Sequence, residues 1–93
     1  MRKNVQIAVI GAGLMGHGIS LTLARAGQYV HIADPDASSR ETVSQRMADS
    51  LKVLGESDEN IAKILKKIEI SGSTAMAVKE AEFVFEAAPK SWT

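Results

Sequence analysis

Three glycines near the N-terminus carry the first chemical signal in the chain. Gly11, Gly13 and Gly16 follow the spacing G-x-G-x-x-G directly after an apolar run at 5–10. In this motif the first glycine permits a tight turn, the second leaves room for a pyrophosphate beside the backbone, and the third lets a helix pack closely on a sheet. The unpaired N–H groups at the start of that helix suit a phosphate. The spacing therefore predicts a binding site for the pyrophosphate of a dinucleotide.

An acidic residue supplies the second half of the same motif. Asp34 follows an apolar segment at 29–33 and lies after Gly16 at close to the roughly 20-residue offset at which an acid binds the adenosine ribose. A carboxylate there accepts hydrogen bonds from the ribose hydroxyls and repels a 2′-phosphate, so we expect NAD rather than NADP. No arginine follows Asp34 directly, and the nearest one along the chain is Arg40. The alternative is an ordinary glycine loop with a chance aspartate, which does not account for the ordered series of strand, glycines, helix, strand and acid.

Hydrophobic periodicity places the motif in alternating strands and helices. Four strands separated by helices favour a parallel sheet with right-handed crossovers. We therefore predict an α/β fold, namely the first four strands of a Rossmann-type sheet in the order 3-2-1-4, with helices on both faces. The ligand crevice of such a sheet lies between strands one and four, which places Ala87 and Ala88 at its border. The predicted strands are 5–10, 29–33, 68–71 and 83–88, and the predicted helices are 15–26, 39–54, 57–68 and 74–81.

Local signals mark the start of two of these helices. Ser38 and Glu41 have the S-x-x-E form of a capping box, which predicts that the second helix begins near Ser39. Ser57, followed by two acidic residues, predicts the start of the third helix. The apolar positions of the second helix recur at helical spacing, so they are expected to pack together. These positions are Val43, Met47, Leu51 and Leu54.

The composition is that of a globular chain and argues against several classes of function. The chain has 93 residues, of which 45% are hydrophobic and 24% are charged, so it can hold one core at most. The formal net charge is zero and aromatic residues are few, which argues against a nucleic-acid or anionic-membrane surface. Cysteine is absent, which excludes disulfides and thiolate catalysis. The two histidines, His17 and His31, are too few for a metal site, so we expect none.

The N-terminus has only a partial likeness to a secretion signal. Arg2 and Lys3 precede an apolar run, but Gln6 and the glycines interrupt that run, and it has a better explanation as the first strand. No stretch is long and apolar enough to span a bilayer. We therefore expect a cytoplasmic protein with no membrane partner.

Four stretches of the sequence resemble one known family. They are IAVIGAGLMGHGIS at 7–20, AGQYVHIADPD at 26–36, ADSLKVLG at 48–55 and AEFVFEAAP at 81–89. In this order they resemble the N-terminal NAD-binding domain of the 3-hydroxyacyl-CoA dehydrogenase family and cover most of the chain. The resemblance implies NAD as cofactor and an acyl-CoA substrate, whose 3-hydroxy carbon would give a hydride to the nicotinamide.

The resemblance also implies roles for individual residues. Asp34 would bind the adenosine ribose, and Ala87 and Ala88 would lie beside the ribose on the nicotinamide side. Ser50 falls where the second helix of the family approaches the acyl-CoA nucleotide, although a solvent-exposed helical serine explains it equally well. The residues that would cradle the pyrophosphate, partly through backbone N–H groups, are Gly11, Gly13, Leu14, Met15 and Gly16.

Neither histidine is a good candidate for an acid–base group. His17 comes just after the last glycine, where the helix start faces phosphate rather than the reacting carbon, so a surface or packing role is expected. His31 lies in the middle of the second strand and is expected to pack there. The catalytic His–Glu pair of the family lies beyond the fourth strand, so no catalytic residue is predicted and the chain alone is expected to be inactive.

Two other functions stay open beside the dehydrogenase. One is a nucleotide-binding regulatory or interaction module that catalyses no reaction. The other is a cofactor domain for a different beta-hydroxyacid, such as carnitine or a gulonate-type sugar acid. An FAD-binding domain shares the glycine loop, but the GAGLMG context and the end of the fourth strand favour NAD.

The last four residues depart from the family pattern. We expect an incomplete NAD-binding Rossmann domain at 1–89 and a non-family tail at 90–93, Lys-Ser-Trp-Thr, where the family has an acidic residue. Our hypothesis is a frameshifted or truncated remnant of a full dehydrogenase; a deliberately shortened chain or a true small protein are the alternatives. The fourth strand would then be an exposed edge bearing Phe83 and Phe85, which predicts marginal stability and self-association.

Overall fold

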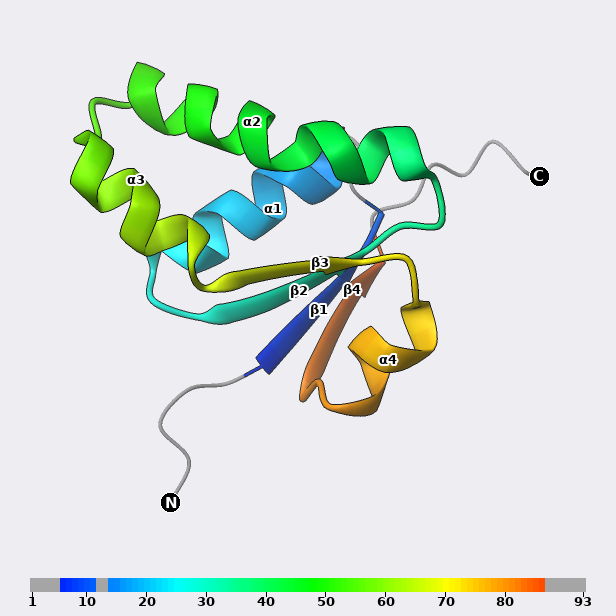
Figure 1. Ribbon diagram of the computed structural model, residues 1–93. Coiled ribbons are helices and arrows are strands. Elements are labelled where there is room, and N and C mark those ends of the chain that lie inside the picture. Colours follow the sequence, from blue (N-terminus) through cyan, green and yellow to red (C-terminus); the bar gives the residue numbers. More distant parts are fainter. Residues whose placement is uncertain (1–5, 12–13, 87–93) are drawn as a thin grey trace.

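A four-stranded parallel sheet forms the centre of the fold, with helices on both faces (Figure 1). The computed structural model describes residues 6–11 and 14–86. The strand order is β3-β2-β1-β4, which confirms the predicted α/β class and topology. In chain order the elements are β1 (Gln6–Ile10), α1 (Leu14–Arg25), β2 (Tyr29–Ala33), α2 (Ala37–Val53), α3 (Asp58–Leu65), β3 (Ile68–Ser71), α4 (Thr74–Lys79) and β4 (Phe83–Glu86).

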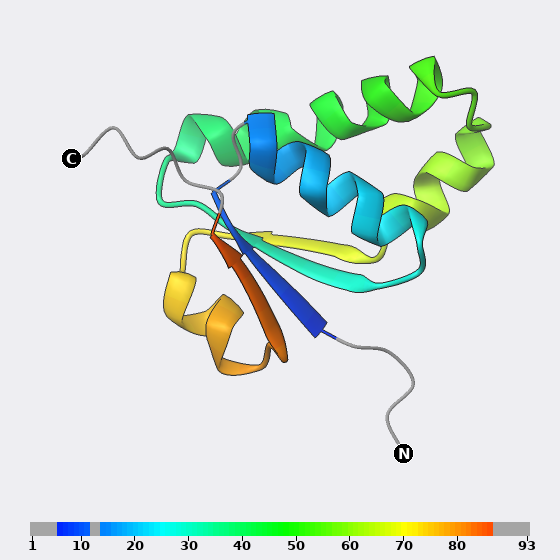
Figure 2. The same cartoon turned by 180° about the vertical axis from the view of Figure 1, so that it is seen from behind.

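The two faces of the sheet are covered unequally. Helices α1, α2 and α3 lie on one face and α4 lies on the other, as the front and back views agree (Figure 1, Figure 2). On the first face, side chains of β1 and β2 pack with those of the helices in the main core. On the second face, a small cluster of Ala8, Ala33 and Ala77 is enough to seat the short α4. The buried members of the main core are Val9, Leu21, Val30, Ile32, Val43, Met47, Leu51 and Ile61.

The start of α2 differs from its prediction. The helix begins at Ala37, and its N-cap is Asp36, whose carboxylate accepts a hydrogen bond from the Ser39 N–H at 3.0 Å. The predicted capping box of Ser38 and Glu41 is therefore wrong. Asp36 has an extended backbone and caps as well as serine does, so it takes the first free N–H groups before Ser38 can. The predicted cap of α3 is confirmed, because the Ser57 side chain accepts from the Asn60 N–H.

The apolar stripe of α2 is confirmed at three of its four positions. Val43, Met47 and Leu51 are each 0% exposed. Leu54 is 55% exposed, so its predicted place in the core is wrong. Leu54 is the C-cap of α2, and Gly55, with φ of 91°, turns the chain away immediately after it. The side chain therefore leaves the stripe where the helix ends.

Helix α4 is slightly shorter than predicted, and the described part of β4 agrees with its prediction. Helix α4 ends at Lys79 rather than at Ala81, because the Glu82 N–H already donates to the Gln6 carbonyl at 2.9 Å and draws the chain onto β1. Strand β4 occupies one edge of the described sheet, and its four residues are all exposed. The predicted continuation to Ala87 and Ala88 lies outside the described residues.

Candidate functional site

The first glycine of the motif and the predicted ribose acid lie side by side at the carboxyl edge of the sheet. Gly11 follows β1 with φ of 106°, a left-handed conformation that strongly favours glycine. Its N–H donates to the carbonyl of Ala33 at 2.7 Å, which joins the end of β1 to the end of β2. Asp34 is the residue that directly follows β2 along the chain. The turn after β1 therefore directly adjoins the acid, as a dinucleotide site requires.

The helix that follows the glycine turn is in place to receive a phosphate. Leu14 and Met15 open α1, so their backbone N–H groups belong to its first turn, where the N–H groups have no partner within the helix. Gly16 is buried in the same turn. Gly13 lies outside the described residues. With the turn at Gly11, this arrangement has the strand–turn–helix context that the glycine motif needs.

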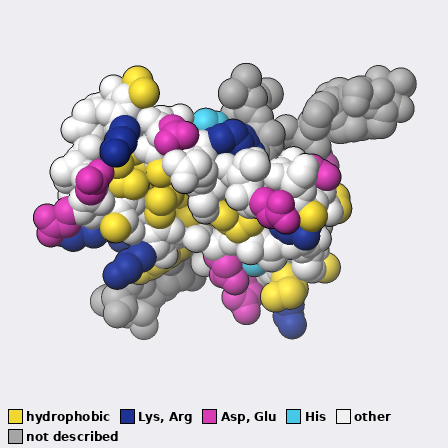
Figure 3. Space-filling view, turned by 45° about the horizontal axis from the view of Figure 1, so that its top comes forward, with side chains coloured by type: hydrophobic (Ala, Val, Ile, Leu, Met, Phe, Trp, Pro, Cys, Tyr) yellow, Lys and Arg dark blue, Asp and Glu magenta, His cyan; other side chains and the backbone are white. Residues whose placement is uncertain are grey.

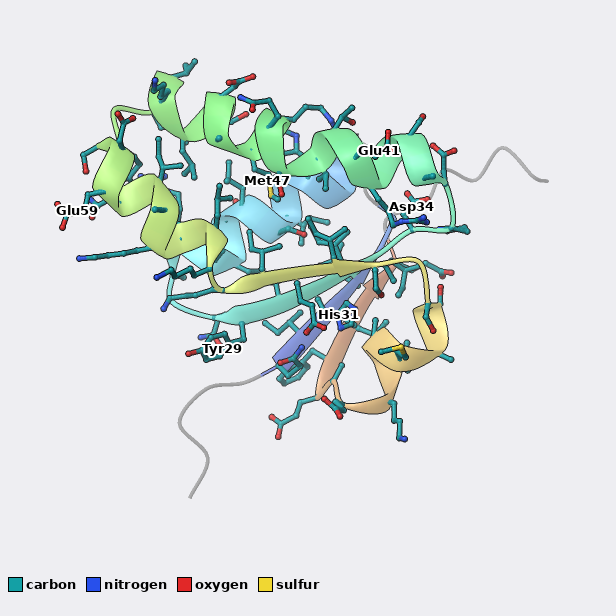
Figure 4. All side chains as sticks on the ribbon, viewed as in Figure 1. Tyr29, His31, Asp34, Glu41, Met47 and Glu59 are labelled. Atoms are coloured by element: carbon teal, nitrogen blue, oxygen red, sulfur yellow. The ribbon has the colours of Figure 1, made fainter. Side chains whose placement is uncertain are left out.

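Three backbone or side-chain hydrogen bonds hold Asp34 in place. Its N–H donates to the Ser71 carbonyl at 3.0 Å, and its Oδ1 accepts the Asp36 N–H at 2.9 Å across Pro35. Its own carbonyl accepts a hydrogen bond from Arg40 Nη1 at 2.7 Å. Figure 4 shows Asp34 beneath the start of α2, at the end of β2. The carboxylate is thus oriented by the chain before any ligand arrives.

Ser50 and His17 form a polar pair that sequence reasoning missed. The Ser50 Oγ of α2 lies 3.2 Å from the His17 Nε2 of α1, and both residues are half-buried. His17 Nδ1 is buried and has no hydrogen-bond partner in the described part of the chain. Burial, and then the positive charge of Arg46, lower the pKa of His17 below its ordinary value. The two residues are 33 positions apart, so only the packing of α1 against α2 reveals the contact.

An open groove lies next to Ser50, along the last turns of α2. Its volume is about 390 Å³, and it is lined by Asp49, Ser50, Val53 and Leu54. Val53 is 86% exposed, which makes this end of the helix apolar at its surface. Figure 3 views the helical face, where hydrophobic side chains are exposed between charged ones. The groove therefore presents both polar and apolar side chains to a ligand, and the Ser50 hydroxyl forms part of its wall.

His31 has the packing role that was predicted for it. Only 4% of the residue is exposed, and its Nε2 lies 2.8 Å from the Ser71 Oγ of β3. Its Nδ1 lies 3.8 Å from a carboxylate oxygen of Glu69. His31 faces α4 rather than the glycine turn, because its register partner on β1 is Ala8, a member of the α4-side cluster. It therefore ties β2 to β3 at a distance from the predicted ligand crevice.

The described residues form neither a metal-ion cluster nor a membrane-spanning helix. Across 6–11 and 14–86, no group of three or more His, Asp or Glu side chains is placed to hold a metal ion. Over the same residues, none of the helices combines the length and apolar character that crossing a membrane demands. The geometry that does fit a ligand is the Gly11–Asp34 edge, where helix N–H groups that donate hydrogen bonds and one carboxylate that accepts them suit a dinucleotide.

Comparisons with known proteins point to one family. A family model described as "3-hydroxyacyl-CoA dehydrogenase, NAD binding domain" matches residues 6–93. The chain is 32% identical over 96 residues to a probable 3-hydroxyacyl-CoA dehydrogenase of Caenorhabditis elegans, covering 94% of this chain and 31% of that protein. It is 34% identical over 86 residues to a probable 3-hydroxybutyryl-CoA dehydrogenase of Bacillus subtilis, covering 88% of this chain and 30% of that protein.

Solved structures agree with the sequence relatives. The crystal structure of (S)-3-hydroxybutyryl-CoA dehydrogenase from Ralstonia eutropha superposes with a TM-score of 0.84 and 27% identity, covering 95% of this chain and 32% of that chain. The 3-hydroxybutyryl-CoA dehydrogenase of Escherichia coli K12 superposes with a TM-score of 0.78 and 27% identity, covering 96% of this chain and 20% of that chain. The chain spans about a third of the length of the curated relatives that it matches.

Proposed function

The chain belongs to the family of 3-hydroxyacyl-CoA dehydrogenase NAD-binding domains, and from this premise we propose a role for each of its site residues. NAD is the cofactor of this domain family. In the proposal, the chain provides the cofactor-binding part of an enzyme that oxidises the 3-hydroxy group of an acyl-CoA to a 3-oxo group. The observation that carries it is the hydrogen bond from Gly11 to Ala33, which sets the phosphate turn beside Asp34.

The glycine turn and the start of α1 bind the pyrophosphate. The left-handed Gly11 turns the chain so that α1 starts directly behind it, and the dipole of α1 favours an anion at that end. Residues with proposed contacts through this turn are Gly11, Gly13, Leu14, Met15 and Gly16.

Asp34 binds the hydroxyls of the adenosine ribose. The hydrogen bond from the Asp36 N–H to Oδ1 fixes the plane of the carboxylate, so little side-chain freedom is lost when a ribose binds. The negative charge at this position opposes a 2′-phosphate. The geometry therefore supports NAD as the preferred form of the cofactor.

Ala87 and Ala88 border the nicotinamide half of the site. Both lie outside the described residues, but the register of the sheet supports the assignment, because Glu86 at the end of β4 pairs with Ile10 just before Gly11. Glu86, the last described residue of β4, thus lies beside the end of β1 that leads to Gly11. When bound, NAD supplies the acceptor for the hydride that leaves the 3-hydroxy carbon.

Hydride transfer from an alcohol also needs a group that takes the hydroxyl proton within hydrogen-bond reach. His17 contacts Ser50, and His31 contacts Ser71 on the α4 side of the sheet, so neither serves as this base. We assign no catalytic residue to the chain, and the domain at 1–89 is inactive by itself in this proposal. The residues at 90–93 have no part in it.

Ser50 contributes to the acyl-CoA site in this proposal. The groove of about 390 Å³ beside its hydroxyl, with the exposed apolar side chains of Val53 and Leu54, supports a ligand at this wall. The competing explanation is that Ser50 only bonds to His17. Binding of coenzyme A to the chain and to Ser50→Ala separates the two, because a purely structural serine leaves the dissociation constant unchanged.

In this proposal the protein acts in the cytoplasm.

The edge of β4 mediates self-association in the same proposal. Phe83, Val84 and Phe85 are 59%, 48% and 43% exposed, and the outer side of β4 has no strand partner among the described residues. Such edges pair with other chains. In sedimentation velocity we expect a concentration-dependent dimer that Val84→Lys disperses. A monomer at all concentrations contradicts this part of the proposal.

Direct titration with NADH tests the proposed function. We expect the chain to bind NADH, and Asp34→Ala to weaken binding by about tenfold or more, because a charge-assisted hydrogen bond is lost. Glu59→Gln is the matched control, since Glu59 is an exposed acid on α3, far from Asp34 (Figure 4). Equal affinities of the wild type and Asp34→Ala would refute the assignment of Asp34.

A further inference from the structure

A polar pair between α1 and α2 borders the groove at the end of α2. Ser50 lines this groove, and its Oγ lies 3.2 Å from the Nε2 of His17 on α1. His17 is half-buried and does not line the groove itself. Which of the two groups donates the hydrogen bond therefore decides what the Ser50 hydroxyl can offer to a ligand.

The other ring nitrogen of His17 indicates where the proton lies. Burial, and then the positive charge of Arg46, lower the pKa of His17, so above pH 6.5 the ring is neutral and carries one proton on either Nδ1 or Nε2. Nδ1 is buried and has no hydrogen-bond partner in the described part of the chain. A buried N–H without an acceptor is rarer in proteins than a buried acceptor without a donor. The proton is therefore on Nε2, which donates to the Ser50 Oγ.

Two other hydroxyls of the same helices show what the Ser50 proton could otherwise bind. The Thr22 Oγ1 donates to the Gly18 carbonyl at 3.0 Å, and the Thr42 Oγ1 donates to the Ser38 carbonyl at 3.2 Å. A carbonyl of the preceding turn is a common acceptor for a hydroxyl in a helix. Among the described residues, Ser50 makes no such bond, and a hydroxyl that accepts from an imidazole keeps its own proton. That proton is therefore available to a ligand in the groove.

We propose that His17 is a positioning residue for the acyl-CoA site: its Nε2–H holds the Ser50 hydroxyl by the oxygen and so presents the Ser50 proton to an acceptor oxygen of the ligand. His17 acts through Ser50 and does not touch the ligand. The inference rests on the proposed role of Ser50 and adds to it the direction of its hydrogen bond. The chemistry recognised is an oxygen acceptor, which coenzyme A carries both in its phosphates and in its amides.

Loss of the imidazole should release the hydroxyl. In His17→Ala, the Ser50 proton can turn to a carbonyl of the preceding turn, as those of Thr22 and Thr42 do, and it is then lost to the ligand. His17→Gln is the conservative variant, because a glutamine side chain also ends in N–H donors. Ser44→Ala is the matched control for Ser50→Ala, since Ser44 is an exposed serine of α2 that does not line the groove.

The experiment is calorimetric titration of coenzyme A into the wild type, His17→Ala, Ser50→Ala and the double variant. We expect His17→Ala to weaken binding by about threefold and Ser50→Ala by about fivefold, as the loss of one neutral hydrogen bond does. In the Ser50→Ala background, His17→Ala is expected to have no further effect, because both residues act through one hydroxyl. His17→Gln is expected to restore most of the affinity, which a purely structural histidine would not explain.

Titration with adenosine 3′,5′-bisphosphate, the nucleotide part of coenzyme A, identifies the acceptor oxygen. If Ser50→Ala weakens the binding of both compounds by the same factor, the acceptor is a phosphate oxygen. If it weakens the binding of coenzyme A alone, the acceptor is an amide oxygen outside the nucleotide.

Each contrary result has a separate meaning. If His17→Ala weakens binding equally with and without the Ser50 hydroxyl, the inference is overturned, since the effect then does not pass through Ser50. It is also overturned if Ser50→Ala binds coenzyme A more weakly and His17→Ala binds it as the wild type does. In both cases the proposed role of Ser50 stands. If Ser50→Ala binds coenzyme A as the wild type does, or the wild type does not bind it, that role fails and the inference falls with it.

Discussion

The two outer strands of the sheet differ in how far the protein covers them. In β3, Ile68 and Ile70 pack against the main core, and the end of the strand is bonded to Asp34 and His31. In β4, all four residues are exposed, including Phe83 and Phe85. The adenosine half of the proposed site belongs to the covered side, and its nicotinamide half belongs to the open side. Among the described residues, the proposed site is therefore covered at its adenosine end and open at its nicotinamide end.

The two sides of the sheet also differ in how far hydrogen bonds organise them. The Gly11 turn and Asp34 are fixed by hydrogen bonds to neighbouring strands, so they are organised before a ligand binds. The end of β4 lacks a covering element among the described residues. We expect variants on the covered side to change stability and affinity, and variants on β4 to change association.

The largest expected effect comes from the core under α2. Met47 is 0% exposed, and Met47→Ala should lower the free energy of unfolding by about 2–5 kcal/mol through lost burial and a cavity. Phe85→Ala, on the open side, should cost about 1 kcal/mol or less, because the ring is already partly in water. Urea unfolding at low protein concentration measures both. Equal losses would mean that the two sides of the sheet are equally packed.

A smaller effect is expected at the start of α2. Asp36→Ala should lower the free energy of unfolding measurably, because the Ser39 N–H loses its cap. Ser38→Ala is the control and should cost less than about 0.5 kcal/mol, as an exposed position that does not cap. The same urea experiment applies. A larger loss of unfolding free energy in Ser38→Ala than in Asp36→Ala would contradict the structure and support the predicted capping box.

The smallest expected effect is a pH dependence at the contact between α1 and α2. The pKa of His17 is lowered in the folded chain by burial and by Arg46, from an ordinary value of 6.5. The unfolded chain therefore binds the proton more readily, so the contribution of His17 to stability is complete above pH 6.5 and is lost as the pH falls below it toward the folded pKa.

The variant His17→Gln isolates this contribution. Between pH 7.5 and pH 5.5, the melting temperature of the wild type should fall further than that of His17→Gln, since both share every other titrating group. His31→Gln is a less suitable comparison, because His31 is buried and its loss would disturb the contact between β2 and β3. Parallel falls in the wild type and His17→Gln would show that His17 does not titrate in this range.

The sequence predicted the features that depend on neighbouring residues. Strand order, the glycine turn and the buried face of α2 follow from local periodicity and from the position of Gly11, whose left-handed φ is a backbone requirement. The cap of α2 was missed because two acceptable caps, Asp36 and Ser38, lie within three residues of each other. The predicted burial of Leu54 was wrong because hydrophobic periodicity does not indicate where a helix ends.

The contacts that the sequence could not predict join distant segments. The pair of His17 and Ser50 forms only when α1 and α2 pack, and the space that Gly72 leaves for Arg40 exists only when β3 lies beside β2. No local pattern encodes either contact. Both contacts involve polar side chains of kinds that are common at protein surfaces. Their partners depend on how whole helices and strands pack together.

Comparison of NADH with ADP-ribose, which lacks the nicotinamide, tests most directly whether the chain holds its cofactor by the adenosine half. Calorimetric titration should give dissociation constants within about threefold of each other, because the contacts of the Gly11 turn and Asp34 are present in both ligands. ADP-ribose binding more than about tenfold weaker than NADH would place much of the affinity on the β4 side and contradict the account. Binding of neither ligand would contradict it altogether.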